Sequence, residues 1–195
     1  MPYDLTITGW TSEGDLREIE YLAAQVPAGG LIVEIGSFLG RTAYAWAKSC
    51  QPSTLVHCID AWVGQPFGKA ELSGTVPEGE VTCSLDAFLR NVGALPNIRY
   101  AVGLSLDAIS SFAPKSIDLI FLDGDHTNPV LKFELAFCPR FLKDDGWLVG
   151  HDFSLKFPDV VTEVVRMARR YDRPVRFAPY RDSTIWAIKM GGPRE

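Results

Sequence analysis

The chain has 195 residues, of which 47% are hydrophobic and 22% charged, and its net charge is −5. This length suits one domain spanning residues 1–195, and the composition excludes a disordered or fibrous protein. The negative charge, without any basic run, gives no reason to expect a nucleic-acid partner. No apolar run approaches the ~20 residues that span a bilayer, and the N-terminus lacks the features of a signal peptide. We therefore expect a cytoplasmic protein without a membrane partner, with its four scattered cysteines reduced and mostly buried.

Helical and strand patterns alternate along the chain. Ser12 to Asp15 resembles a capping box, and apolar residues recur at helical spacing from there to Val26. Short apolar runs then predict strands that alternate with further helices. The strands are expected at residues 31–33, 54–60, 98–102, 117–122 and 147–150, and the helices begin near Gly40, at Ser84, after Ser105, at Asn128–Pro129 and at Pro158.

The last third of the chain adds two more expectations. The helix after Asn128–Pro129 is expected to start on this cap-plus-proline pair. Two final β segments, near 175–177 and 184–189, flank a turn and predict a hairpin. The inward face of the helix is expected to carry Val130, Phe133, Phe137 and Phe141.

The stretch 61–82 follows no helical or strand pattern. It contains Pro66, Pro77 and four glycines, together with Trp62 and Phe67. A loop of this length in a compact domain is usually functional, so we expect a lid over a binding site. The alternative is that its aromatic residues pack onto the edge of the sheet.

The strands are apolar throughout, as in a parallel sheet that is covered on both faces. Such strands, alternating with helices and closing on a hairpin, predict a doubly wound, Rossmann-like α/β sheet. We expect it to be mostly parallel, with an antiparallel C-terminal hairpin strand and helices on both faces. Ligands bind such sheets at the carboxyl ends of the strands. The polar residues at these ends are Gly36 and Ser37, Asp60, Gly103 to Ser105, Asp123 to His126, and His151 with Asp152.

The turn after the first strand, Glu34-x-Gly36-x-x-x-Gly40, lets a ligand lie against bare backbone at the positive end of a helix. It lacks the middle glycine of the dinucleotide fingerprint, which argues against a nicotinamide or flavin cofactor. The turn instead resembles motif I of class I S-adenosylmethionine-dependent methyltransferases. That resemblance implies that the backbone around Gly36 packs against the cofactor, and that Thr42 or nearby amides reach its methionine carboxylate. The alternative is a plain structural turn.

Other strand ends support a nucleoside cofactor. Asp60 ends the second strand, where a carboxylate can accept both ribose hydroxyls. The segment from Gly103 to Asp107 resembles the one beside adenine in catechol-type O-methyltransferases, and the likeness to these enzymes and to methyltransferase family 24 runs in order from Val33 to the final hairpin. It implies S-adenosylmethionine bound by Glu34, Gly36, Ser37, Phe38, Gly40, Thr42, Asp60, Ala61, Ser105 and Asp123.

Asp123, His151 and Asp152 are expected to meet at neighbouring strand ends, where two carboxylates and an imidazole suit a divalent ion. The metal-dependent O-methyltransferases, of the catechol and macrolide-sugar types, hold Mg²⁺ with acidic residues at these two ends. Asp123 and Asp152 match that pattern, so the resemblance implies Mg²⁺ or Mn²⁺. His151 departs from the usual acidic residue and either binds the ion or supports its ligands. The alternative is a hydrogen-bonded network without metal.

His126 lies three positions after Asp123, where the catechol-type enzymes have a lysine as general base. A histidine is a suitable base near neutral pH because its unperturbed pKa is about 6.5. We therefore expect catalytic roles for His126 and Asp123: the metal acidifies the hydroxyl of the acceptor and His126 removes its proton. Asp125 is expected only to orient His126 or its loop.

Together these features predict an S-adenosylmethionine-dependent O-methyltransferase that acts on a small-molecule hydroxylated substrate. A homodimer is expected from the resemblance alone. One alternative is a metal-independent methyltransferase acting on oxygen or nitrogen, with His126 or His151 as base. Another is a non-catalytic nucleoside-binding module, and a dehydrogenase is the least favoured. Four arginines are expected at the surface without a role: Arg41, Arg90, Arg99 and Arg181.

Overall fold

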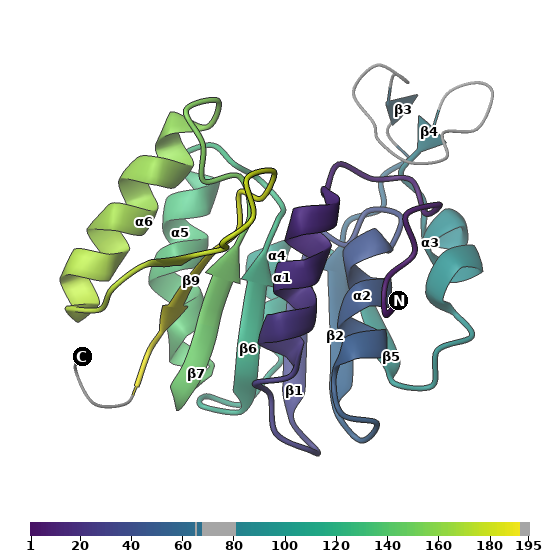
Figure 1. Ribbon diagram of the computed structural model, residues 1–195, viewed down its shortest axis with the longest axis horizontal. Coiled ribbons are helices and arrows are strands. Elements are labelled where there is room, and N and C mark those ends of the chain that lie inside the picture. Colours follow the sequence, from purple (N-terminus) through teal and green to yellow (C-terminus); the bar gives the residue numbers. More distant parts are fainter. Residues whose placement is uncertain (65, 68–80, 192–195) are drawn as a thin grey trace.

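The computed structural model describes residues 1–64, 66–67 and 81–191 (Figure 1). In this part of the chain a sheet of seven strands has the order β5-β2-β1-β6-β7-β9-β8, and β3 pairs with β4 separately. The strands are β1 (Leu31–Ile35), β2 (Leu55–Asp60), β3 (Pro66–Phe67), β4 (Val81–Thr82), β5 (Ile98–Val102), β6 (Ile117–Leu122), β7 (Leu142–Gly150), β8 (Arg176–Phe177) and β9 (Trp186–Lys189). The helices are α1 (Glu13–Ala23), α2 (Arg41–Ser49), α3 (Leu85–Val92), α4 (Ser105–Ile109), α5 (Val130–Phe137), the 3-10 turn η2 (Cys138–Arg140) and α6 (Pro158–Tyr171).

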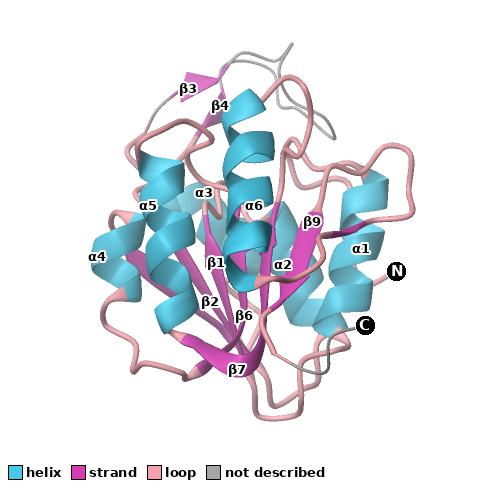
Figure 2. Ribbon diagram, turned by 90° about the vertical axis from the view of Figure 1, so that its left-hand side faces the viewer, coloured by secondary structure: helices cyan, strands magenta, loops and turns pink. Residues whose placement is uncertain are grey.

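The prediction of a mostly parallel, doubly wound sheet is confirmed. Strands β5, β2, β1, β6 and β7 pair in parallel, whereas β9 is antiparallel to both β7 and β8, as expected of the hairpin. Helices cover both faces of the sheet, with α1 beside α2 on one face and α5 beside α6 on the other (Figures 1 and 2).

Strand β6 lies between two hydrophobic cores, one on each face of the sheet. All six of its residues are buried. Leu119 and Phe121 pack into the core beneath α1 and α2, and Ile120 and Leu122 into the core beneath α5 and α6. The continuous apolar run thus serves both faces, because successive side chains of a strand point to opposite sides.

Several local signals act as the sequence predicts. The Ser12 hydroxyl accepts a hydrogen bond from the amide of Asp15, whose carboxylate accepts one from the Ser12 amide, so the capping box starts α1. Ser84 caps α3 in the same way, by accepting from the amide of Ala87. All four cysteines are buried and free of disulfides, in agreement with the expectation of reduced thiols.

The predicted inward face of α5 is confirmed for Phe137 and Phe141, which pack into or against the core, and wrong for Phe133. Phe133 is 56% exposed, whereas Leu131, Glu134 and Leu135 are buried. The predicted start is also wrong, since Pro129 is the N-cap of α5 and provides no side-chain cap. The helix turns its leucine stripe toward the sheet and brings a glutamate with it.

The predicted loop 61–82 contains the short pair β3 and β4, and residues 65 and 68–80 lie outside the described residues, so the lid stays a prediction. Trp62 is buried. Its ring lies 4.8 Å from that of Phe88, and its indole N–H donates to the carbonyl of Phe38 at 2.8 Å. Trp62 therefore packs against α3 and the turn after β1.

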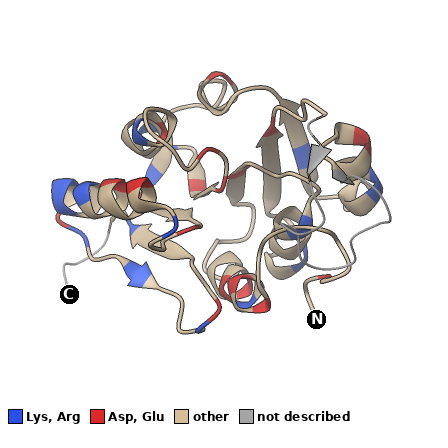
Figure 3. Ribbon diagram, turned by 90° about the horizontal axis from the view of Figure 1, so that it is seen from above, with Lys and Arg blue, Asp and Glu red and all other residues tan. Residues whose placement is uncertain are grey.

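The carboxyl ends of the parallel strands face the viewer in Figure 3, with acidic segments near the centre and the Arg residues of α6 at one end. Residues 8–12, which precede α1, reach the same edge of the sheet. Among the described residues, no helix has the length and apolar character needed to cross a membrane.

Candidate functional site

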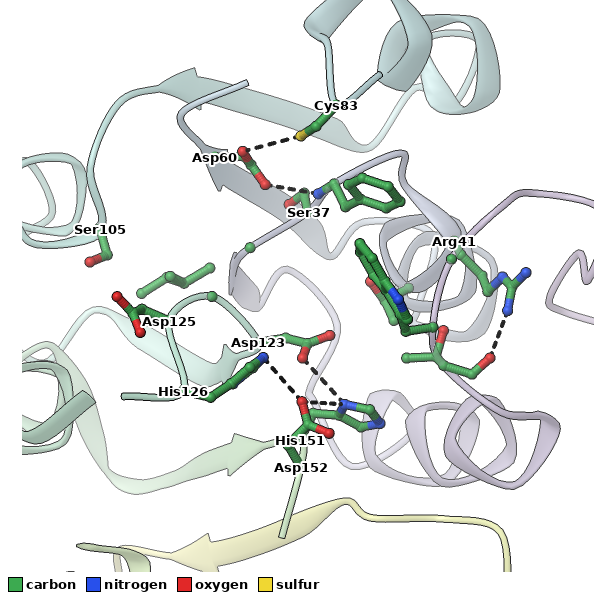
Figure 4. Close-up of a pocket in the computed structure, with 18 of the residues that line it drawn as sticks. Ser37, Arg41, Asp60, Cys83, Ser105, Asp123, Asp125, His126, His151 and Asp152 are labelled. Carbon is green, nitrogen blue, oxygen red and sulfur yellow. Dashed lines mark hydrogen bonds and ion pairs between the residues drawn. The ribbon is translucent and has the colours of Figure 1, made fainter. Parts of the chain in front are cut away.

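A cavity of about 1110 Å³ opens at the carboxyl ends of the strands. It lies between the glycine turn after β1 and the loops after β6 and β7 (Figure 4). Of the predicted residues, Glu34 is buried in β1 and Gly40 caps α2, and neither lines the cavity. The structure brings the others to its wall: Gly36, Ser37, Phe38, Thr42, Asp60, Ala61, Ser105, Asp123, Asp125, His126, His151 and Asp152.

The turn between β1 and α2 brings bare backbone to this cavity. Gly36 has a φ of +89°, and a Cβ there would lie 2.2 Å from the carbonyl oxygen of Asp123. Only glycine therefore allows the ends of β1 and β6 to approach so closely. Gly40, with a φ of +90°, is the N-cap of α2 and offers no side-chain acceptor. The N-terminus of α2 therefore has no side-chain cap, and such a helix end suits an anionic group of a ligand.

Glu34 and Ser37 are buried polar groups beside this turn. Both carboxylate oxygens of Glu34 and the Ser37 hydroxyl make no hydrogen bond within the described part of the chain. Burial raises the pKa of Glu34 to about 7, and the nearby hydroxyls of Ser37 and Thr42 oppose only part of that rise. Buried polar groups without partners are uncommon, and the Ser37 hydroxyl, which lines the cavity, fits a ligand that brings a hydrogen-bonding group to the turn.

The raised pKa of Glu34 predicts a pH-dependent stability of the ligand-free protein. Its folded pKa of about 7 exceeds the ordinary value of 4.5. The folded state therefore binds the proton more tightly, and stability falls as pH rises between these values, by on the order of 3 kcal/mol. Glu34→Gln removes this effect, so the Tm of the variant relative to wild type should be higher at about pH 8 than at about pH 5. A difference in Tm between Glu34→Gln and wild type that is the same at both pH values would contradict this prediction.

Asp60 lies at the end of β2, facing the glycine turn. Its Oδ2 accepts a hydrogen bond from the Phe38 amide at 2.9 Å, and its Oδ1 accepts one from the Trp62 amide at 2.8 Å. A carboxylate oxygen has more than one acceptor site, so both oxygens can still receive ligand hydroxyls. Two backbone amides thus hold Asp60 in a position suited to a ribose.

A cluster of carboxylates and imidazoles lies where β6 and β7 end (Figure 4). The potential ligand atoms of Asp123, His126 and Asp152 all lie within 4.8 Å of one another. His126 Nε2 is 3.0 Å from Asp152 Oδ2, and burial raises the pKa of Asp123. Two carboxylates and an imidazole at this spacing suit a divalent cation.

His151 lies behind these carboxylates, with both ring nitrogens facing acidic groups. Nδ1 is 3.3 Å from Asp123 and 3.3 Å from Asp152, and Nε2 is 3.0 Å from Asp15. Burial lowers the pKa of His151, but the surrounding carboxylates outweigh it and raise the pKa well above its ordinary value. The carboxylates around the ring favour its charged form, and His151 contacts Asp123 and Asp152 together from behind. Of the two roles that the sequence left open, this geometry favours the supporting one.

Sequence reasoning missed the part that Asp15 plays here. The capping pattern accounts for its contact with Ser12, but Oδ2 also lies 3.0 Å from His151 Nε2, and Oδ1 accepts from the Thr184 amide at 3.0 Å. Burial raises the pKa of Asp15, and the hydrogen bond and charge of His151 more than offset this and lower it to about 2. Asp15 thus links the start of α1 to the end of β7.

The loop after β6 is fixed by its own side chains. Asp125 Oδ1 accepts hydrogen bonds from the amide of Thr127 at 2.9 Å and from its hydroxyl at 2.7 Å. The ring of Phe157 packs edge-on against His126, with centroids 5.0 Å apart. Asp125 therefore shapes the loop, and Phe157 supports the imidazole that the loop carries.

The surface position expected for Arg41 is wrong. Its side chain is buried and donates to the carbonyls of Ile7 at 2.5 Å and Thr11 at 2.7 Å. Arg41 is the first residue of α2, so it ties the N-terminal segment across the wall of the cavity. A lone arginine in a helix gives no sequence signal for such a contact.

Residues 33–153 match a family model described as a methyltransferase domain, which spans more than half of the chain. No curated protein matches the chain.

Solved structures of similar fold include several methyltransferases. A methyltransferase from Geobacter sulfurreducens has a TM-score of 0.64 and 18% identity, covering 93% of this chain and 81% of its own. An S-adenosylmethionine-dependent O-methyltransferase from Thermotoga maritima has a TM-score of 0.62 and 16% identity. The match covers 95% of this chain and 68% of that one. A TDP-rhamnose 3′-O-methyltransferase of calicheamicin biosynthesis has a TM-score of 0.61 and 17% identity. The match covers 91% of this chain and 78% of that one.

At such identities the likeness to solved structures shows the fold, whereas the family match covers the sequence from β1 to the end of β7. That segment contains the glycine turn, Asp60 and the cluster at the ends of β6 and β7. The chain belongs to the methyltransferase-domain family and is an S-adenosylmethionine-dependent methyltransferase.

Proposed function

We propose that this methyltransferase transfers the methyl group to a hydroxyl of a small-molecule acceptor, using a divalent cation held by Asp123 and Asp152. The observation that carries the proposal is the group of Asp123, His126 and Asp152, whose ligand atoms lie within 4.8 Å of one another. The group forms one side of the cavity whose opposite wall includes the glycine turn and Asp60.

The residues around the turn fit S-adenosylmethionine. The Ser37 hydroxyl, which lines the cavity without a hydrogen-bond partner among the described residues, suits the ammonium group of its methionine part. The α2 N-terminus suits the methionine carboxylate, and Asp60 suits the ribose. With the ribose at Asp60 and the methionine part at the turn, the methyl group lies on the side of the cavity that faces the acidic cluster.

The carboxylates of Asp123 and Asp152 also fit a divalent cation such as Mn²⁺ or Mg²⁺, because both ions accept carboxylate oxygens as ligands. The cation, when bound, supplies positive charge that orients the acceptor hydroxyl and lowers its pKa. His151 holds Asp123 and Asp152 side by side from behind, with Asp15 supporting it in turn.

His126 is proposed as the general base. Its Nε2 points at Asp152 in this structure and lies on the cavity side of the cluster, where an acceptor hydroxyl would approach. Phe157 holds the ring in place. The proton moves from the hydroxyl to the imidazole of His126 as the oxygen attacks the methyl carbon and the carbon–sulfur bond breaks, which releases S-adenosylhomocysteine. Much of the acceleration comes from holding the two reactants in register.

A metal-independent methyltransferase acting on oxygen or nitrogen is the second candidate. It is favoured by the 3.0 Å contact of His126 Nε2 with Asp152, because a carboxylate can orient an imidazole base without any cation. A non-catalytic nucleoside-binding module is the third, and it would bind the cofactor without turnover.

Treatment with EDTA distinguishes these candidates. Methyl transfer from radiolabelled S-adenosylmethionine is measured on a panel of catechols, hydroxylated aromatic thioesters and nucleotide-linked sugars. We expect turnover on at least one acceptor, a loss of at least ~100-fold after EDTA, and recovery with Mg²⁺ or Mn²⁺. Full activity after EDTA would contradict the metal. Binding of S-adenosylmethionine in calorimetry without turnover on any acceptor would support the third candidate.

A further inference from the structure

Glu134 is a buried acid in the cavity that the sequence patterns did not single out. It lies on the inner face of α5, is 2% exposed, and lines the cavity. Its Oε2 is fully buried and makes no hydrogen bond within the described residues. A buried carboxylate oxygen without a partner costs free energy, so a ligand that donates a hydrogen bond there would gain affinity.

The surroundings of Glu134 do not offer it a cation. Among the described residues Glu134 makes no ion pair, and the charge of Asp125 acts on it. Burial raises the pKa of Glu134 to about 7, while the nearby Ser105 hydroxyl opposes the rise and Asp125 adds to it. This setting suits a neutral N–H donor, which can approach a buried carboxyl group without bringing a further charge into the site.

Glu134 also lies at a defined end of the cavity. Its neighbour Ser105 is the first residue of α4, directly after β5, and Figure 4 shows Ser105 and Asp125 on one side of the cavity. Asp60 lies on a second side, and the cluster of His126, His151 and Asp152 on a third. A nucleoside whose ribose lies at Asp60 and whose sulfonium lies toward the cluster would direct its base toward Ser105 and Glu134.

We propose that Glu134 is a specificity-determining residue that accepts a hydrogen bond from the 6-amino group of the cofactor's adenine. The inference rests on the assignment of S-adenosylmethionine as cofactor. It extends that assignment, because it names the group that distinguishes adenine from a purine without an amino group. A leucine at this position would fill similar space and lack the acceptor.

Calorimetry with two ligands tests the role of Glu134. The first is S-adenosylhomocysteine, and the second is its analogue in which hydrogen replaces the 6-amino group. Wild-type protein should bind S-adenosylhomocysteine at least about 10-fold more tightly than the analogue, as expected for a hydrogen bond to a charged or partly charged group. Glu134→Leu should lower the affinity for S-adenosylhomocysteine about 10-fold or more, and the variant should bind the two ligands equally tightly. Phe133→Leu, at the exposed neighbouring position of α5, should behave as wild type.

The comparison separates recognition of the amino group from a structural role of Glu134. A structural role would weaken both ligands alike and leave their ratio unchanged in Glu134→Leu, which would overturn the inference. Equal affinity of the wild-type protein for both ligands would also overturn it, without any need for a folded variant. If wild-type protein bound neither ligand, the cofactor assignment and this inference would both fail.

Discussion

Replacing Asp152 with alanine is expected to lower turnover by on the order of a thousandfold, while the Kd for S-adenosylhomocysteine stays nearly unchanged. Asp152 shares the cluster with Asp123 and His126, and its Oδ2 contacts both His126 and His151. Without this carboxylate the cation loses a ligand and His126 loses its partner, whereas the glycine turn and Asp60 keep their contacts. Methyl-transfer rates, Mn²⁺ titration and calorimetry with S-adenosylhomocysteine check the three parts of this prediction.

The backbone at Asp152 calls for a matched variant. Its φ is +61°, a left-handed conformation in which alanine is strained and asparagine is tolerated. Asp152→Asn therefore removes the charge without adding that strain, and it should lose turnover and Mn²⁺ affinity as the alanine variant does. Asp145→Asn, which changes an exposed carboxylate on β7, the strand that ends two residues before Asp152, should keep both. An active Asp152→Asn enzyme would show that strain, and not the lost charge, causes the defect.

The fold was predictable because its signals are local. The capping residues Ser12 and Ser84 sit at the starts of α1 and α3, and the apolar run of β6 needs both faces of the sheet to be covered. Once the strands are placed, the doubly wound topology puts their carboxyl ends at one edge. The sequence alone therefore suffices to assign Gly36, Asp60, Asp123 and Asp152 to one cavity.

The missed residues depend on contacts between distant parts of the chain. Asp15 meets His151 across 136 positions, and Arg41 meets the carbonyl of Ile7 across 34. Neither contact has a periodic pattern, and each residue had a sufficient local explanation. The pattern on α5 misled for another reason. Phe133 has the same helical spacing from Phe137 as Leu131 has from Leu135, but Phe133 is exposed and Leu131 is buried, and periodicity alone cannot tell the two apart.

Asp60→Ala is expected to have the opposite effect to Asp152→Ala. It should lower the affinity for S-adenosylhomocysteine on the order of 100-fold, because two ribose hydroxyls would lose their hydrogen bonds to the carboxylate. Hydrogen bonds to a charged acceptor contribute more than those to a neutral one. The Mn²⁺ affinity should stay unchanged, since Asp60 contacts the amides of Phe38 and Trp62 and no residue of the metal cluster. Calorimetry with S-adenosylhomocysteine and with Mn²⁺ measures both.

Two variants separate the ribose contact from the support that Asp60 gives the turn. Asp60→Asn keeps one oxygen acceptor, so it should hold the turn better than alanine and show an intermediate loss of S-adenosylhomocysteine affinity. Asp107→Asn, at an exposed carboxylate on α4, should bind as wild type. If Asp60→Ala and Asp152→Ala lost S-adenosylhomocysteine equally, cofactor and metal would not be bound by separate residues. Opposite effects would mean that the end of β2 holds the methyl donor and the ends of β6 and β7 activate its acceptor.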